Sequence, residues 1–207
     1  MRDVRIDAKP ANLSLLANPV ISYFEELHSL IVDCEITNLT GSTMTLEQGA
    51  DIALRMFERV RSRERKIMLI GNGGSAAVAS HEALDFWNAG KIRATSFNDY
   101  AQLTCLSNDY GYENVYSKAV EMFADPGDTL IAISSSGRSV NILNAVEAAR
   151  VKQCSVITFS GFEIDNPLRS VGDLNFYLKS TSYGQVEVGH LSLIHYLTDM
   201  VKMNRRG

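Results

Sequence analysis

Apolar side chains recur with helical spacing in several stretches of the chain. From Pro19 to Ile31 they return every three to four residues, which is typical of a helix with one buried face, and proline suits a first helical turn. Thr45 and Gln48 have the spacing of a capping box, in which each side chain accepts a hydrogen bond from the other residue's backbone amide, so a second helix should begin there. Further helices are predicted over residues 75–88, 140–151 and 183–203.

Short apolar runs of strand length alternate with the later helices. This alternation favours right-handed crossovers and a parallel sheet covered by helices on both faces. We therefore expect a single α/β domain over residues 1–207, in which residues 1–64 form an N-terminal arm and helical extension and the polar residues 1–17 are the arm. The helices before the first strand and after the last could bundle with those of another copy. The predicted strands lie at 66–70, 93–97, 129–133, 155–159 and 174–178.

Composition and charge narrow the classes of partner. The chain is 45% hydrophobic and 21% charged, with a net charge of −4 and no block of like charges, which disfavours binding to nucleic acid or to an anionic membrane. No stretch is apolar and long enough to span a bilayer, and the N-terminus lacks the apolar core of a secretion signal. Cys34, Cys105 and Cys154 each lie in an apolar run and are predicted to be packed, reduced thiols of a cytoplasmic protein.

A glycine-rich turn follows the first predicted strand directly. The segment Gly71-Asn72-Gly73-Gly74-Ser75 leads straight into a helix. Glycines let the backbone turn sharply and bring amides close to an anion, and the start of a helix adds partial positive charge. Taken alone, such a turn is also compatible with an ordinary strand-to-helix corner.

A second loop of the same kind follows the strand at 129–133. It contains Ser134, Ser135, Ser136 and Ser139 just before another helix, and a helix cap explains one of these hydroxyls but not four. Because ligands of parallel sheets bind at the carboxyl ends of the strands, both loops should open onto one crevice that holds a phosphate. The lysine of a Walker A motif and the glycine pattern of dinucleotide-binding proteins are absent.

Histidines and carboxylates lie on the helix after the glycine loop and on the C-terminal helix. His81 and Asp85 are four residues apart and share one helix face. Glu187 and His195 fall within about a quarter-turn of each other around their helix. A histidine and a carboxylate from each helix can transfer protons or hold a divalent metal such as zinc. Paired histidines at a helix interface are the structural alternative, which we favour for His190.

In the order and spacing of these motifs the chain resembles the sugar isomerase (SIS) family, and most closely its phosphoheptose isomerases. The resemblance implies a three-layer α-β-α sandwich with a five-stranded parallel sheet, the SIS fold, assembled as a homotetramer with active sites between subunits. It extends over roughly residues 20–203 and rests on Gly71 to Ala76, His81 six residues after Ser75, Asn108 to Glu113, Ser134 to Ser139, Glu187 and His195.

The resemblance also implies roles for individual residues. Proton transfer in an aldose–ketose isomerisation is assigned to Asp85 and His195. Some members of the family bind zinc through the positions that match His81, Asp85, Glu187 and His195. Contacts with the sugar or its phosphate are assigned to Asn72, Gly73, Ser75, Asp99, Ser134, Ser135, Ser136, Ser139 and Glu187.

The chain departs from that family at three places. Asp85 stands where the family usually has glutamate, and Glu187 stands where it usually has glutamine. The segment between Asp85 and Asp99 is shorter than in typical heptose enzymes, with Ala89 at the position of an arginine. Compared with glutamine, the carboxylate of Glu187 is a better ligand for a metal, but it adds negative charge near a phosphosugar.

The residues and the resemblance together predict an isomerase that converts sedoheptulose 7-phosphate to D-glycero-D-manno-heptose 7-phosphate through an enediol(ate), in heptose biosynthesis, with zinc as the candidate cofactor. Two alternatives stay open. One is an isomerase of another, smaller sugar phosphate, which the shortened segment suggests. The other is a non-catalytic module that binds a phosphosugar as a regulator or assembles with a replication initiator. Retention of both histidines and both carboxylates favours an enzyme, because a binding module has no need of them.

Overall fold

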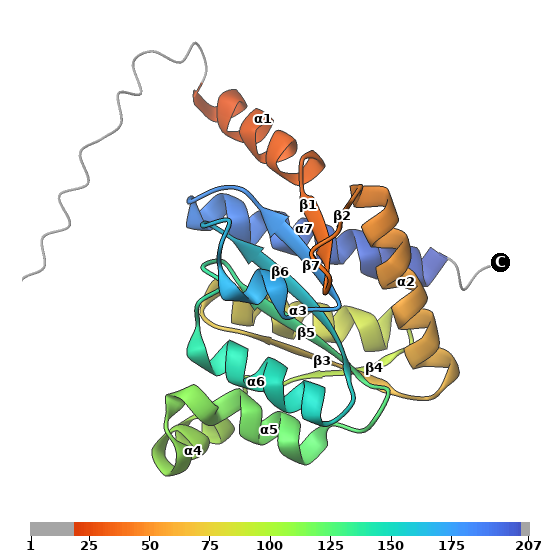
Figure 1. The fold of residues 1–207 in the computed structure, drawn as a ribbon, viewed down its shortest axis with the longest axis vertical. Coiled ribbons are helices and arrows are strands. Elements are labelled where there is room, and N and C mark those ends of the chain that lie inside the picture. Colours follow the sequence, from red (N-terminus) through yellow and green to blue (C-terminus); the bar gives the residue numbers. More distant parts are fainter. Residues whose placement is uncertain (1–18, 204–207) are drawn as a thin grey trace, which may run out of the picture.

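The sheet at the centre of the molecule agrees with the predicted alternation of strands and helices. The computed structural model describes residues 19–203, so the predicted arm at residues 1–17 lies outside the described range. Within that range seven strands form one sheet in the order β2-β1-β7-β6-β5-β3-β4 (Figure 1). The strands are β1 (Glu35–Asn38), β2 (Thr43–Met44), β3 (Lys66–Gly71), β4 (Arg93–Ser96), β5 (Thr129–Ser134), β6 (Ser155–Gly161) and β7 (Leu174–Leu178).

The predicted five-stranded parallel sheet is present, but it is not the whole sheet. Strands β7, β6, β5, β3 and β4 are parallel neighbours in that order. The hairpin β1–β2 extends this sheet on the β7 side, where β1 pairs antiparallel with β7 and Ile36 lies opposite Phe176. These strands lie within residues 1–64, which the sequence assigned to a helical extension, so the sheet is larger than expected and the class of fold is unchanged.

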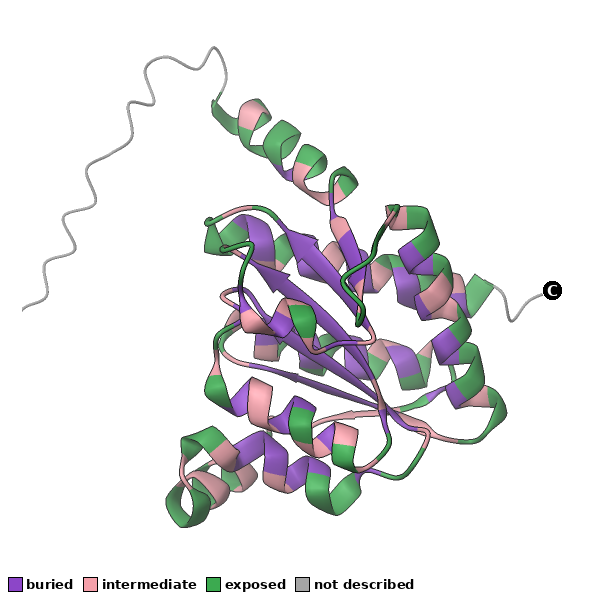
Figure 2. Ribbon diagram, viewed as in Figure 1, coloured by how far each residue is buried: buried purple, intermediate pink, exposed green. Residues whose placement is uncertain are grey.

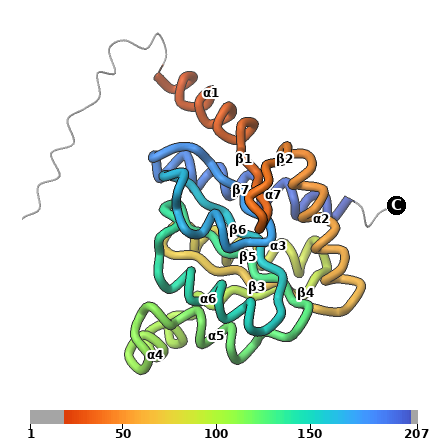
Figure 3. The backbone as a smooth tube through the Cα atoms, viewed as in Figure 1, coloured from red at the N-terminus to blue at the C-terminus, as the bar shows by residue number. Residues whose placement is uncertain are grey.

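Helices cover both faces of the sheet and make three layers (Figures 1 and 3). Helix α2 begins at the predicted capping box, in which the Thr45 hydroxyl accepts from the Gln48 amide and the Gln48 side chain accepts from the Thr45 amide. One face of the sheet is covered by α2 (Leu46–Ser62), α3 (Gly74–Asn88) and α7 (Tyr183–Met203). The other face is covered by α5 (Val115–Phe123) and α6 (Val140–Val151), with α4 (Tyr100–Tyr110) beside them. Short 3-10 turns lie at Tyr112–Asn114 and Pro167–Ser170.

The apolar core is split by the sheet into two clusters. Alternate residues of β5 point to opposite sides: Ile131 and Ile133 pack with α2, α3 and α7, whereas Leu130 and Ala132 pack with α5 and α6. All of these side chains are fully buried, which explains the continuous apolar runs of the parallel strands. Burial of each large apolar side chain stabilises the fold by about 1.5–3 kcal/mol.

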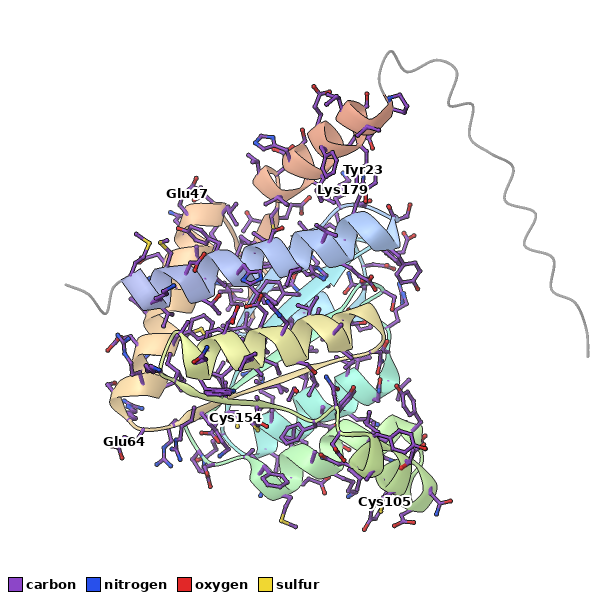
Figure 4. The ribbon with its side chains drawn as sticks, turned by 180° about the vertical axis from the view of Figure 1, so that it is seen from behind. Tyr23, Glu47, Glu64, Cys105, Cys154 and Lys179 are labelled. Atoms are coloured by element: carbon purple, nitrogen blue, oxygen red, sulfur yellow. The ribbon has the colours of Figure 1, made fainter. Side chains whose placement is uncertain are left out.

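Helix α1 (Pro19–Val32) is mostly exposed. It extends from the body of the molecule, and Figure 2 shows it mostly in the colour of exposed residues. Leu27 is its one buried residue, while Val20 and Phe24 are 62% and 60% exposed. Its inner side passes the start of α7, at the junction marked by Tyr23 and Lys179 in Figure 4.

The cysteine prediction is correct for two of the three thiols. Cys34 and Cys154 are buried and unpaired, as expected, and burial raises the pKa of each thiol, to about 12 and about 11. Cys105 is exposed on α4 (Figure 4), and its Sγ lies 3.5 Å from Oδ2 of Asp109. The apolar run around Cys105 misled the prediction because α4 has no fully buried residue. Among residues 19–203, no helix combines the length and the apolarity needed to cross a membrane.

Candidate active site

The glycine loop ends β3 and begins α3. Gly71 has no room for a side chain, because an added Cβ would lie 2.5 Å from the backbone carbonyl of Ser75. Gly73 has a φ of +55° and is the N-cap of α3, with no side chain capping the helix. Because glycine has no side chain, the N-cap residue makes no capping hydrogen bond to the first amides of α3. Ser75, by contrast, is buried in the first turn of the helix.

The serine loop lies beside the glycine loop. Strands β3 and β5 are adjacent and parallel, with Gly71 opposite Ile133, so the two loops leave the sheet at neighbouring points of one edge. The amide of Gly137 donates to the Ser134 carbonyl (3.0 Å), and the hydroxyls of Ser134 and Ser139 are 3.4 Å apart. Ser139 is the N-cap of α6 and makes no capping bond with its side chain. The glycine and serine loops therefore lie side by side as predicted, and their binding of phosphate stays a prediction.

The remaining serines of this loop differ in accessibility. Ser136 is half-buried, and its Oγ accepts from the Arg138 amide (3.3 Å). Ser135 is buried, and its Oγ has no hydrogen-bond partner among the described residues. Because the Ser135 hydroxyl is enclosed, the contact with phosphate that the resemblance assigns to this residue is more readily made by its backbone.

Asn166 packs against the serine loop at Gly137, a contact that the sequence did not predict. Its Nδ2 donates to the carbonyls of Gly161 (3.1 Å) and Glu163 (2.7 Å). Its Oδ1 would lie 1.9 Å from a Cβ added at Gly137, so the loop is closely packed on this side chain. An asparagine just before Pro167 gives no local signal of this contact, since Asn166 is also the ordinary cap of the following turn.

A network of amides joins the two loops. Nδ2 of Asn72 donates to Oδ1 of Asn141 (2.9 Å), and Nδ2 of Asn141 donates to Oδ1 of Asn72 (2.8 Å). The Tyr112 hydroxyl also donates to Oδ1 of Asn72 (2.9 Å). Tyr112 comes from the segment Asn108 to Glu113, whose match to the SIS family had no stated role. Here it holds Asn72 at the junction of the loops.

Asp99 is a helix cap in this structure. Its Oδ1 accepts from the Gln102 amide (3.0 Å), and its side chain is exposed at the start of α4. Its neighbour Asn98 bonds to the first turns of α3, with Nδ2 donating to the Ala76 carbonyl (2.8 Å). Asp99 therefore follows a residue that contacts the start of α3, and its predicted contact with the sugar stays a prediction.

His81, Asp85 and His195 come together as predicted. Oδ2 of Asp85 lies 3.6 Å from Nε2 of His81 and 3.6 Å from Nδ1 of His195. The two imidazole rings meet edge to face, with centroids 5.0 Å apart. The Asp85 side chain is 30% exposed and that of His195 is 39% exposed, so ligands can reach both. The Asp85 carboxylate thus lies close to both imidazoles, an arrangement that is suited to proton transfer.

Glu82 joins this cluster, although the sequence did not single it out. Its side chain is fully buried, and Oε1 lies 3.4 Å from Nδ1 of His195. Burial raises the pKa of Glu82 to about 8, with a further rise from Asp85 and an opposing effect of the Thr198 hydroxyl. A signal was available, because Glu82 stands in the buried stripe of α3 between Val78 and Phe86, where an apolar residue is expected.

Glu187 does not lie in this cluster, contrary to the predicted ligand set. Its carboxylate is packed against Gly74, where an added Cβ would come within 2.3 Å of Oε2. Glu187 and His195 share a face of α7, but their eight-residue separation is about 12 Å along an α-helix, and the place of Glu187 among the metal ligands stays a prediction. A carboxylate at the start of α3 is instead stabilised by the positive end of that helix.

Helices α3 and α7 are parallel neighbours that touch at three levels. Glu187 meets Gly74 at one end, and His195 meets Asp85 in the middle. At the other end a Cβ added at Gly90 would lie 3.2 Å from Cγ1 of Val201. These contacts fix how far the acid–base cluster lies from the glycine loop.

The cluster has the composition of a site for a divalent metal. His81, Glu82, Asp85 and His195 each offer one ligand atom, and these atoms all lie within 4.8 Å of one another. Imidazole nitrogens and carboxylate oxygens are ligands that zinc accepts.

His190 lies outside this cluster and is structural, as predicted. It is buried, and its Nε2 lies 3.1 Å from the Ser160 carbonyl.

Comparisons with known proteins agree with this geometry. Residues 35–161 match the model of the SIS domain family. The phosphoheptose isomerases of Trichlorobacter lovleyi and Thiobacillus denitrificans are 34% and 35% identical to the chain over 164 residues each, covering 76% and 75% of it and 83% and 81% of their own lengths. The structure of phosphoheptose isomerase from Neisseria gonorrhoeae superposes with a TM-score of 0.75 at 27% identity, covering 88% of this chain and 97% of that one.

The family model, the relatives and the structure all include both loops and the helix that links the glycine loop to the acid–base cluster. Since the family model matches more than half of the chain, and the fold is that of solved relatives, the chain belongs to the SIS domain family.

Proposed function

We propose that the chain is an aldose–ketose isomerase that converts sedoheptulose 7-phosphate to D-glycero-D-manno-heptose 7-phosphate. Relatives at 34% and 35% identity carry the name phosphoheptose isomerase. The observation that carries the proposal is the placement of two uncapped phosphate-binding loops at one sheet edge, with an acid–base cluster on the helix that begins at one of them.

The spacing along α3 suits a long open-chain sugar. Six residues separate Ser75 from His81, which corresponds to a rise of about 9 Å along the helix. An open chain of seven carbons can extend over that length with its phosphate at the loops and its carbonyl end at the cluster. A shorter sugar phosphate would reach less far, so this spacing favours the heptose over the smaller substrates.

In this proposal the phosphate is held by the start of α3 and by the serine loop, without a lysine or arginine. The backbone amides at Gly73 and Gly74 and the hydroxyls of Ser136 and Ser139 supply hydrogen bonds to it. Asn72 and Ser75 position the sugar. Glu187, which lies at Gly74, contacts the sugar through hydroxyl groups that can donate to its carboxylate.

Asp85 and His195 then carry out the proton transfers. Asp85 removes a proton from C1 of the ketose, and the electron pair of that C–H bond becomes the C1=C2 bond of an enediol(ate). His195 supplies a proton to O2 and accepts one from O1. Return of the proton from Asp85 to C2 completes the aldose, so the carbonyl moves from C2 to C1 with no net gain or loss of protons.

A zinc ion fits the residues of the cluster. His81, Asp85 and His195 would hold it, because their donor atoms are already gathered and of the right chemical type. When bound, the metal would act as a Lewis acid that stabilises charge on the sugar oxygens.

The proposal includes a cytoplasmic homotetramer with active sites at subunit interfaces. Exposed apolar residues on α1, among them Val20 and Phe24, support an assembly through this helix. Gln185 and Glu26 are 3.2 Å apart where α1 meets α7, two residues before Glu187. A neighbour that packs on α1 would therefore lie close to the sugar-binding side of the site.

The direct test uses the purified chain with sedoheptulose 7-phosphate in deuterated water, with added zinc or with a chelator. We expect the aldose product and deuterium at its C2, both detected by NMR. His195→Ala should reduce kcat by at least about a hundredfold, since it removes a proton-transfer group. Lys202→Ala, on the exposed end of the same helix, is the matched control and should leave kcat unchanged.

Two results would count against an isomerase. If the wild-type protein forms no aldose and takes up no deuterium under any metal condition, the heptose proposal fails. If, in addition, the protein binds the sugar phosphate and His195→Ala binds it equally well, the chain is a binding module of the SIS fold. A panel of shorter sugar phosphates in the same assay would reveal an isomerase of a different substrate.

A further inference from the structure

Glu82 is an ionisable residue on the buried face of α3. It occupies the buried face of α3 at the level of Val78 and Phe86 and has no exposed side-chain surface. Burying a carboxyl group is costly unless its oxygens find hydrogen-bond donors. The contacts of its two oxygens therefore indicate why a glutamate is present.

The two oxygens of Glu82 are not equally satisfied. Oε2 is 3.3 Å from the hydroxyl of Thr198, but that hydroxyl has a single hydrogen and a closer acceptor, the His195 carbonyl at 2.9 Å. Oε1 is buried and has no hydrogen-bond partner among the described residues. The donor facing it is Nδ1 of His195, 3.4 Å away. A slight turn of the imidazole would bring Nδ1–H into hydrogen-bond range.

Asp85 faces the same nitrogen but is placed differently. Its Oδ2 lies 3.6 Å from Nδ1 of His195, while the Asp85 side chain keeps 30% of its surface exposed and also faces His81. Asp85 can turn to a ligand, whereas Glu82 is enclosed and cannot. The structure thus contains one fixed and one accessible carboxyl group beside a single imidazole.

We propose that Glu82 is a positioning residue that accepts a hydrogen bond from Nδ1–H of His195 and so fixes the tautomer in which Nε2 is free to act on the ligand. A carboxyl group behind a functional histidine is a common means of setting its tautomer and ring orientation. Glu82 leaves Asp85 free to serve as the base. The role in catalysis rests on the proposed isomerase function, whereas the tautomer does not.

The test compares Glu82→Leu, which removes the acceptor, with Glu82→Gln, which keeps an acceptor oxygen of the same shape. The matched control is Glu147→Gln, an exposed glutamate on α6. The tautomer of His195 is read in the full-length, metal-free protein by ¹⁵N–¹H correlation NMR on ¹⁵N-histidine, with the signals assigned through His195→Gln. Kinetics on the same variants with sedoheptulose 7-phosphate give kcat and KM separately, and thermal melts confirm folding.

We expect wild type, Glu82→Gln and the control to hold His195 in the Nδ1–H form, and Glu82→Leu to show a mixture of tautomers. We expect kcat of Glu82→Leu to fall about 10–100-fold with little change in KM, because the phosphate loops are untouched, and Glu82→Gln to keep most of kcat. A folded Glu82→Leu variant with the wild-type tautomer would overturn the proposal.

An altered tautomer with unchanged kcat would also overturn the catalytic part of the proposal. If the wild-type protein does not isomerise the sugar, the proposed function fails separately. The NMR spectra alone then decide whether Glu82 positions His195.

Discussion

The shape of the serine loop depends on the absence of a Cβ atom at Gly137. Gly137 turns the serine loop toward α6 with a φ of +62°, and the side chain of Asn166 fills the space where a Cβ would lie. Gly41 has a similar backbone, with a φ of +77°, but nothing lies within 4 Å of its missing Cβ. Substitutions at Gly137 and Gly41 can therefore separate the effect of backbone conformation on stability from the effect of side-chain packing.

Gly137→Ala is expected to destabilise the fold by about 2–4 kcal/mol, and Gly41→Ala by about 1 kcal/mol, because both changes strain a left-handed backbone but only the first displaces Asn166. Urea unfolding measures both values, and calorimetry with inorganic phosphate measures loop function. Equal unfolding midpoints for the two variants would show that Asn166 does not shape the loop.

His190 should make stability depend on pH. Burial lowers its pKa from 6.5 to about 4, partly opposed by the contact with the Ser160 carbonyl. Between those pH values the unfolded chain binds a proton at this residue and the native protein does not. The free energy of unfolding should therefore decrease as pH falls from 6.5 to 4, by up to about 3 kcal/mol from His190.

Urea titrations across that range test the effect of His190. His190→Gln should flatten the pH dependence, whereas His28→Gln, at an exposed position on α1, should not. If His190→Gln and wild type lose stability in parallel on acidification, another group is responsible.

For single residues, the sequence predicted which side chains share a face of a helix, but not how far apart they lie along the helix axis. Helical spacing placed His81 and Asp85 together correctly, because four residues make one turn. It placed Glu187 and His195 on the same face of α7 but gave no measure of their separation of two turns along the helix, which leaves Glu187 outside the cluster. It missed Glu82 because a single glutamate next to a histidine is ordinary, and only the burial of its neighbours marks it as unusual.

At the scale of helices and strands, the sequence predicted most elements whose burial is periodic or complete, although it missed α5, which has five buried residues. Helices α3, α6 and α7 and the five parallel strands agree with the predicted ranges to within one or two residues. Helix α4 was missed because none of its residues is fully buried, so it has no apolar stripe. Strand β1 was missed because it is short and becomes a strand only by pairing with β7, which is 135 or more residues away in the chain.

Asp99, at the start of α4, has two interpretations that substitution can separate. Asparagine caps helices as well as aspartate does, so Asp99→Asn should leave the melting temperature unchanged, while Asp99→Ala should cost about 1 kcal/mol. If the carboxylate also contacts the sugar, Asp99→Asn should raise KM. A stable Asp99→Asn variant with wild-type KM would limit Asp99 to capping.

At the scale of the whole molecule, α1 has little support from the rest of its own chain, since Leu27 is its one buried residue. Its apolar residues do not form part of either core cluster except near its C-terminal end, where Leu30 and Ile31 pack against the body. Isolated helices of this length are marginal in water. Its stability therefore depends on what covers it, which the proposed tetramer supplies.

Phe24→Asp should dissociate the proposed tetramer, because it places a charge at an exposed apolar position of α1. Val151→Asp, at an apolar residue on α6 that is 78% exposed, is the control and should leave assembly intact. Light scattering coupled to gel filtration gives the mass of each variant. A Phe24→Asp protein with wild-type mass would show that α1 is not the interface.

The three levels of contact between α3 and α7 have a consequence for energetics. Since the two helices cannot slide past each other without breaking contacts at both ends, the imidazoles and carboxyl groups are in place before any sugar arrives. The entropy of gathering them is lost during folding rather than during each turnover, so little reorganisation remains for the chemical step.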